Sequence, residues 1–177
     1  LPGNLGKAAK TMIRAPIAGR VMNIPIKKGE TAVPSVQSIS GSELLFIADP
    51  LDSFKTYKDS TFAMMTQAQA RGHQVFACEV NTLHWKLGQK VSAQVVALEL
   101  TPQGPHWYKI KGEPTGRIQA LHQFDAVLMR KDPPFDSEFF YATHLLSQAT
   151  REGAKVFNNA QALREHPEKL AILEFPQ

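Results

Sequence analysis

The sequence predicts an α/β domain with a mostly parallel sheet flanked by helices, an antiparallel excursion within it, and a short β-hairpin arm before it. Continuous apolar runs at 44–49, 74–80 and 124–130 are typical of strands that are buried on both faces. Segments with helical spacing follow the first and third of these runs. In residues 1–42, by contrast, proline and glycine recur so often that only hairpins fit.

Composition indicates one ordinary domain with an appended segment, because the chain has 177 residues, 43% of them hydrophobic and 20% charged. No run approaches the ~18 uncharged apolar residues of a membrane helix, so we expect no transmembrane segment. The single cysteine, Cys78, excludes an internal disulfide, and its apolar neighbours predict a small core residue in a reduced compartment. The chain opens without an initiator methionine, which favours a fragment, a processed product or an engineered piece.

The net charge of +4 is distributed in a way that argues against nucleic-acid binding. Residues 1–42 carry six basic residues and one acidic residue, whereas the rest of the chain carries 14 basic and 15 acidic residues. The basic arm contains no aromatic side chain that could stack on a base. We therefore expect no nucleic-acid partner.

The strand-rich and helical segments alternate from residue 43 onward. A helix over 59–72 can begin at an Asp59 or Ser60 cap and end at Gly72, and it joins two buried strands as a parallel, right-handed unit.

The middle of the chain has a different pattern. Strands at 90–100 and 106–111, joined by the turn TPQGP, predict the antiparallel excursion. A helix over 137–152, a short strand at 155–158 and a helix at 159–166 follow the strand at 124–130. The first of these helices should bury one side, formed by Phe139, Phe140, Thr143, Leu146 and Ala149.

Two polar loops, 49–59 and 129–136, follow the carboxyl ends of predicted parallel strands, where open α/β sheets bind ligands. Together they form a mixed-charge rim suited to a zwitterionic ligand such as a peptide. Its members are Asp49, Asp52, Lys55, Lys58, Asp59, Arg130, Lys131, Asp132 and Asp136.

Three blocks carry a family resemblance: FIADPLDSFKTYKDSTFAMMTQAQARGH, VLMRKDPPFDSEFFYATHLL and VFNNAQALREHPEKLAILEFP. In this order they resemble the N-terminal domain of prokaryotic glutathione synthetase, over about residues 43–177. The resemblance implies a domain of the type that precedes ATP-grasp domains, in a homo-oligomeric, cytoplasmic ligase. That family joins γ-glutamylcysteine to glycine with ATP and Mg²⁺, through an acyl phosphate.

Within the rim we expect five side chains to bind the dipeptide substrate: Asp49, Lys58, Asp59, Arg130 and Asp132. The resemblance also assigns Lys169, in HPEKLAI, as the first of two lysines that such enzymes direct at the ATP phosphates.

The sequence contains no glycine-rich phosphate loop, and the family places that loop and the magnesium ligands in an ATP-grasp domain downstream of residue 177. We assign no catalytic residue and no metal ligand to this chain, since its six histidines show no helical pairing. Alone, it should neither catalyse the ligation nor bind ATP tightly.

Residues 1–49 carry a second resemblance. The runs TMIRAPIAGRVMNIPIKKGETAVP and PSVQSISGSELLFIAD resemble the lipoyl-like barrel-sandwich segment of periplasmic efflux adaptor subunits. The hairpin tip, AGRVMN, lacks a modifiable lysine, which implies a scaffold and not a cofactor carrier. The alternative function is therefore an adaptor fragment with a structural role in the periplasm, and a fusion of the two families would reconcile both resemblances.

Overall fold

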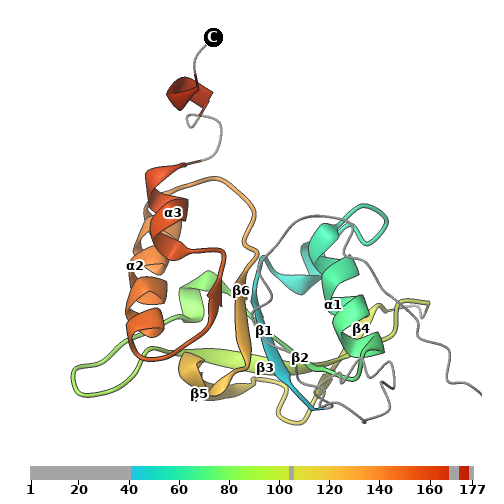
Figure 1. Cartoon of the computed structure of the whole chain (residues 1–177). Coiled ribbons are helices and arrows are strands. Elements are labelled where there is room, and N and C mark those ends of the chain that lie inside the picture. The colour runs from blue at the N-terminus through green and yellow to red at the C-terminus, as the bar shows by residue number, and fades with distance from the viewer. Residues whose placement is uncertain (1–40, 104–105, 168–171, 176–177) are drawn as a thin grey trace, which may run out of the picture. The chain divides into compact units, whose positions relative to one another are not determined.

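The computed structural model describes residues 41–103, 106–167 and 172–175 (Figure 1). The chain divides into two compact units, Leu1–Val36 and Gln37–Gln177, and the fold below is that of the second unit. The predicted hairpin arm at 1–42 lies outside the described residues except for its last two positions, so its structure and its boundary remain predictions. No helix in the described part of the chain has the length and apolar character needed to cross a membrane.

A seven-stranded sheet forms the centre of the second unit, and it confirms the predicted fold class. Its order is β4-β3-β2-β1-β6-β7, with β5 paired to β3. The strands are β1 (Glu43–Ile47), β2 (Gln74–Cys78), β3 (Ser92–Leu100), β4 (Tyr108–Lys111), β5 (Arg117–Ala120), β6 (Ala126–Met129) and β7 (Val156–Phe157). Strands β2, β1, β6 and β7 run parallel, while β3 is antiparallel to β2, β4 and β5.

The antiparallel excursion contains one more strand than the sequence predicts. Strand β5 has the sequence RIQA, which is too short and too exposed to show an apolar alternation. It forms because it pairs with the first half of β3, a long-range contact that local pattern does not encode.

The helices α1 (Ser60–Ala70), α2 (Ser137–Arg151) and α3 (Ala160–Glu165) begin at side-chain caps. Asp59, and not Ser60, caps α1, because its carboxylate accepts the Phe62 N–H at 2.9 Å. In Figure 1, α1 covers one face of the sheet, and α2 with α3 covers the other. Short 3₁₀ turns complete the connections at Leu51–Ser53, Val80–Thr82 and Leu121–Gln123.

Strand β1 divides its side chains between two apolar cores. Leu45 and Ile47 are fully buried in the cluster that includes α2, whereas Phe46 packs with Met65 of α1. The predicted buried side of α2 is correct for four of its five members, but Phe140 is 39% exposed. Phe140 follows Phe139 by one position, about 100° around the helix, so it lies at the edge of the buried stripe.

The chain turns in opposite directions after β1 and after β6, which creates a topological switch point between these neighbouring strands. The crossover through α1 leads from β1 to β2, and the crossover through α2 leads from β6 to β7 on the other side. Ile47 pairs with Met129 in the parallel register, so both strands end side by side. Ligands of open α/β sheets bind at such a point.

Candidate functional site

The loops that follow β1 and β6 are joined at the switch point by Asp49. Its carboxylate accepts the Lys131 ammonium at 2.7 Å and the backbone N–H of Asp132 at 2.8 Å. The Asp49 and Lys131 side chains are 25% and 24% exposed, so the ion pair is reached by solvent yet partly shielded. This contact links the two loops, and its two partners line different cavities: Asp49 lines a polar one and Lys131 an apolar one.

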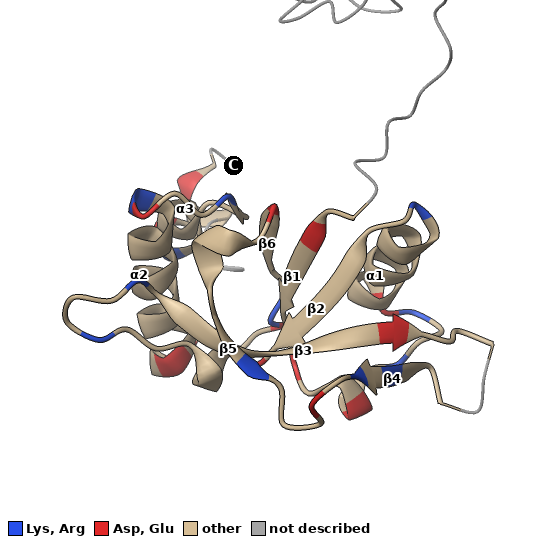
Figure 2. Cartoon of the chain, turned by 90° about the horizontal axis from the view of Figure 1, so that it is seen from below, with Lys and Arg blue, Asp and Glu red and all other residues tan. Residues whose placement is uncertain are grey.

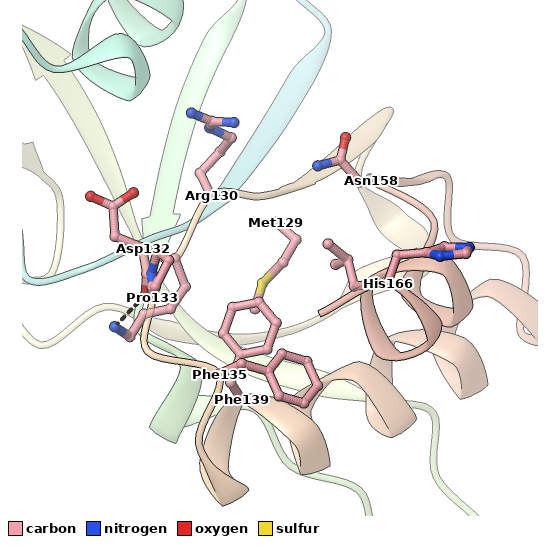
Figure 3. A pocket seen from close by; sticks show the side chains of 10 residues that line it. Met129, Arg130, Asp132, Pro133, Phe135, Phe139, Asn158 and His166 are labelled. Atoms are coloured by element: carbon pink, nitrogen blue, oxygen red, sulfur yellow. Dashed lines mark hydrogen bonds between the residues drawn. The ribbon is translucent and has the colours of Figure 1, made fainter. Parts of the chain in front are cut away.

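Arg130 extends from the end of β6 toward the first turn of α1. Its backbone N–H donates to the Ile47 carbonyl at 2.7 Å, continuing the sheet by one bond. Its guanidinium donates to the hydroxyl oxygens of Ser60 at 2.8 Å and of Thr61 at 3.2 Å. Figure 3 shows Arg130 and the preceding Met129 pointing to opposite sides, as successive strand residues do.

Polar cavities lie on the α1 side of this edge. One of about 130 Å³ is lined by Asp49, Ser53, Phe54, Asp59, Thr61, Arg130 and Asp132. An adjoining, more open one of about 380 Å³ is lined by Ser53, Lys55, Lys58, Asp59, Ser60, Thr61 and Asp132. The structure thus brings all five predicted substrate residues to these two adjoining cavities, although whether they bind substrate stays a prediction.

Other members of the predicted rim have structural partners elsewhere. Asp136 caps α2 through the Phe139 N–H, and the carboxylate of Asp52 accepts the Tyr108 hydroxyl at 2.7 Å. That hydrogen bond to a carboxylate is the main cause that raises the pKa of the Tyr108 phenol, and burial adds to it. The rim as a whole carries both signs of charge, and Figure 2 shows basic and acidic residues interspersed over the described elements.

An apolar cavity of about 250 Å³ lies on the α2 side of the same edge (Figure 3). Met129, Phe135, Phe139 and Leu163 form its apolar lining. The remaining lining residues are Arg130, Lys131, Asp132, Pro133, Asn158 and His166.

Sequence reasoning did not select Asn158 or His166. Asn158 directly follows the parallel strand β7, so the rule that selected the two predicted loops also applies to it.

Cys78 ends β2 as a core residue, which confirms the prediction from its apolar neighbours. It is 7% exposed, and burial raises the pKa of its thiol to about 12, with a smaller contribution from the Glu79 charge and an opposing hydrogen bond with Thr82. The thiol is therefore neutral at pH 7, the form that does not act as a nucleophile.

Across residues 41–103, 106–167 and 172–175, no three His, Cys, Asp or Glu side chains gather as a metal site. Lys169, the predicted phosphate contact, lies outside the described residues.

Comparison with known proteins identifies the family to which this fold belongs. Residues 43–164 match the family described as "Prokaryotic glutathione synthetase, N-terminal domain". The chain is 52% identical over 132 residues to the glutathione synthetase of Ralstonia nicotianae, covering 75% of this chain and 40% of that protein. It is 49% identical over 139 residues to the enzyme of Nitrosomonas europaea, covering 76% and 42%. For the enzyme of Neisseria meningitidis the identity is 48% over 141 residues, covering 75% and 42%.

The chain thus spans about two fifths of the length of these relatives. The match begins at residue 43, so it leaves the adaptor resemblance of residues 1–49 as a prediction. From Glu43 onward the fold, the matched residues and the identities agree: this chain belongs to the prokaryotic glutathione synthetase N-terminal domain family.

Proposed function

We propose that this chain is the N-terminal, dipeptide-binding part of an ATP-dependent ligase that joins γ-glutamylcysteine to glycine. The family membership and the three relatives described as glutathione synthetase support the activity. The part of the activity assigned to this chain is substrate binding, and the five residues that bind the dipeptide are Asp49, Lys58, Asp59, Arg130 and Asp132.

One observation carries the binding proposal: charged groups of both signs converge on the switch point between β1 and β6. γ-Glutamylcysteine has an ammonium group and carboxylates, so its recognition requires both acceptors and donors. The carboxylates of Asp59 and Asp132 are suited to the ammonium, while Lys58 and the Arg130 fork are suited to carboxylates. Arg130 uses part of its fork on Ser60 and Thr61, which orients the guanidinium before the substrate arrives.

ATP and Mg²⁺ belong to the remaining part of the ligase in this proposal. ATP supplies the phosphoryl group that activates the dipeptide carboxylate, and Lys169 contacts its phosphates. We assign no step of the reaction to a metal held by this chain, because the family resemblance places the magnesium ligands in the ATP-grasp domain. The family membership supports the remaining parts of the proposal, which are a cytoplasmic homo-oligomer and an ATP-grasp domain in the complete ligase.

A chimeric ligase tests the proposal. Joining this chain to the part of the Ralstonia nicotianae enzyme that follows the matched residues should give a protein that forms glutathione, while this chain alone should form none. In that chimera, Arg130→Ala should raise KM for γ-glutamylcysteine by about 10- to 100-fold, the cost of one charge-assisted contact, with little change in KM for ATP.

The control is Arg151→Ala, because Arg151 lies in the last turn of α2 and, within the described part of the chain, its side chain hydrogen-bonds only to Gln148 on the same helix. This variant should keep both KM values. An Arg130→Ala chimera that loses affinity for ATP and keeps its affinity for the dipeptide would contradict the assignment of this edge to the dipeptide.

A further inference from the structure

The loop between β1 and α1 contacts the polar cavity on one side and the β3–β4 hairpin on the other. Phe54 makes both contacts. It lines the cavity of about 130 Å³ together with Arg130 and Asp132. Its ring also stacks on Trp107, with centroids 5.3 Å apart and planes at 17°. Trp107 is not among the lining residues of either polar cavity, so its influence on the site is indirect, and Phe54 is the contact that itself lines a cavity.

Trp107 is itself held from several directions. The ring of Phe62, in the first turn of α1, meets it edge-on at 5.3 Å and 89°. The ring of the adjacent Tyr108 lies 4.8 Å from it. Its carbonyl accepts the Thr101 N–H at 2.8 Å, across the two ends of the hairpin connection. These contacts leave the indole little freedom, which makes it a firm surface for the Phe54 ring.

Two polar contacts attach the hairpin to the same loop and helix. The Tyr108 hydroxyl donates to Asp52 at 2.7 Å, just before Phe54 along the chain. The side-chain amide of Gln69, in α1, accepts the Leu100 N–H at 2.7 Å and donates to the Leu100 carbonyl at 2.9 Å. The hairpin, the loop and α1 therefore pack as one unit at the rim of the site.

We propose that Trp107 is a positioning residue for substrate binding, because its stack on Phe54 fixes the loop that carries Lys58 and Asp59. The proposal rests on the proposed function, since it concerns the same site. It gives the antiparallel excursion a role in the reaction, although that segment contains none of the three sequence blocks that resemble the family. A shift of ~1 Å in a binding group can cost about 100-fold in rate, so loss of the stack has a measurable effect.

The test compares Trp107→Leu, Trp107→Phe and the control Trp85→Leu in the full 177-residue chain. Leucine removes the stacking surface, and phenylalanine restores an aromatic face. Trp85 is the other tryptophan and is 45% exposed. Each variant is first checked for cooperative unfolding. Hydrogen exchange is then measured at the Lys58 and Asp59 amides, both of which donate to the Lys55 carbonyl, at 2.9 and 3.0 Å. Affinity for γ-glutamylcysteine is measured by NMR titration.

In Trp107→Leu, the amide hydrogens of Lys58 and Asp59 should exchange at least fivefold faster than in the parent chain. The same variant should bind the dipeptide at least fivefold more weakly. Trp107→Phe should recover most of the slow amide exchange and most of the dipeptide affinity. Trp85→Leu should match the parent chain in both measurements. A folded Trp107→Leu with parental loop exchange overturns the proposal, as does faster exchange with parental affinity. If the parent chain itself does not bind the dipeptide, the proposed function fails and the role of Trp107 in binding fails with it. If the parent chain binds the dipeptide and Trp107→Leu binds it equally well, only the positioning role fails.

Discussion

Replacing Asp49 should lower the free energy of unfolding of this domain measurably, because Asp49 links the loop after β1 to the loop after β6. Its carboxylate accepts two donors from the loop after β6, the Lys131 ammonium and the Asp132 N–H. Asp49→Ala removes both contacts, so the two loops at the switch point lose this direct polar link. Asp49→Asn keeps an oxygen for the Asp132 N–H and loses the charge.

The magnitude follows from the two contacts. A hydrogen bond to a charged group contributes about 1.5 to 3 kcal/mol, and a partly exposed ion pair adds about 0 to 1 kcal/mol. Because the Asp49 and Lys131 side chains are about a quarter exposed, water replaces part of what is lost. We therefore expect Asp49→Ala to lower the free energy of unfolding by about 2 kcal/mol and Asp49→Asn by about 1 kcal/mol. For a domain of this size, 2 kcal/mol lowers Tm by about 4 to 8 °C.

Urea and thermal unfolding followed by circular dichroism measure the effect, and Asp125→Ala is the matched control. Asp125 accepts a single backbone N–H, that of Glu43, at 2.9 Å, at the amino end of the same two strands. Asp125 is exposed, so water replaces much of its single contact, and with no cation its loss should cost about 1 kcal/mol, half of the loss expected at Asp49. Equal losses for Asp49→Ala and Asp125→Ala, or no loss at Asp49, would refute the view that the ion-paired contact joins the loops.

Three further predictions concern single residues. Asp59→Ala removes the cap of α1 and should cost about 1 kcal/mol in urea unfolding, whereas Asp59→Asn should retain most of that stability; equal losses would contradict the capping role. The Cys78 pKa is raised from about 9 to about 12 by burial, so the stability that the neutral thiol contributes is present below pH 9 and lost as pH rises toward 12. Between pH 9 and pH 12 the free energy of unfolding of Cys78→Ala should therefore fall less steeply than that of the parent, by at most ~1.4 kcal/mol per pH unit. Parallel plots of this free energy against pH would contradict the prediction. Lys169→Ala in the chimeric ligase should lower kcat/KM for ATP by about one to two decades without unfolding the domain, and unchanged ATP kinetics would remove this contact.

The sequence determined the elements that repeat a local pattern. Continuous apolar runs predicted β1, β2 and β6, because a strand with two covered faces has no polar side. The start of α1 followed from Asp59 and Ser60, whose short polar side chains are suited to the free N–H groups of a first turn. Helical spacing predicted α2, whereas its cap, Asp136, was assigned to the rim. The core position of Cys78 followed from its neighbours in the same way.

The candidate site was predicted in outline, because the carboxyl ends of parallel strands must meet at one edge. This rule selected the loops that carry Asp49, Arg130 and Asp132 before the strand order was known. It was applied to two strands and not to β7, so Asn158 was missed.

Only the tertiary structure decided how each charged side chain in those loops is used. The sequence places Asp49, Asp52 and Asp136 in one polar rim, yet Asp49 pairs with Lys131, Asp52 accepts from Tyr108 and Asp136 caps a helix. Tyr108 lies 56 residues from Asp52, and Asp132, the other donor to Asp49, lies 83 residues from it, and no local periodicity records such separations. Likewise Trp107 reaches the site through Phe54 because β3 and β4 fold back beside α1. Local pattern sets which segments become strands and helices, whereas contacts between distant segments exist only after the sheet has brought them together.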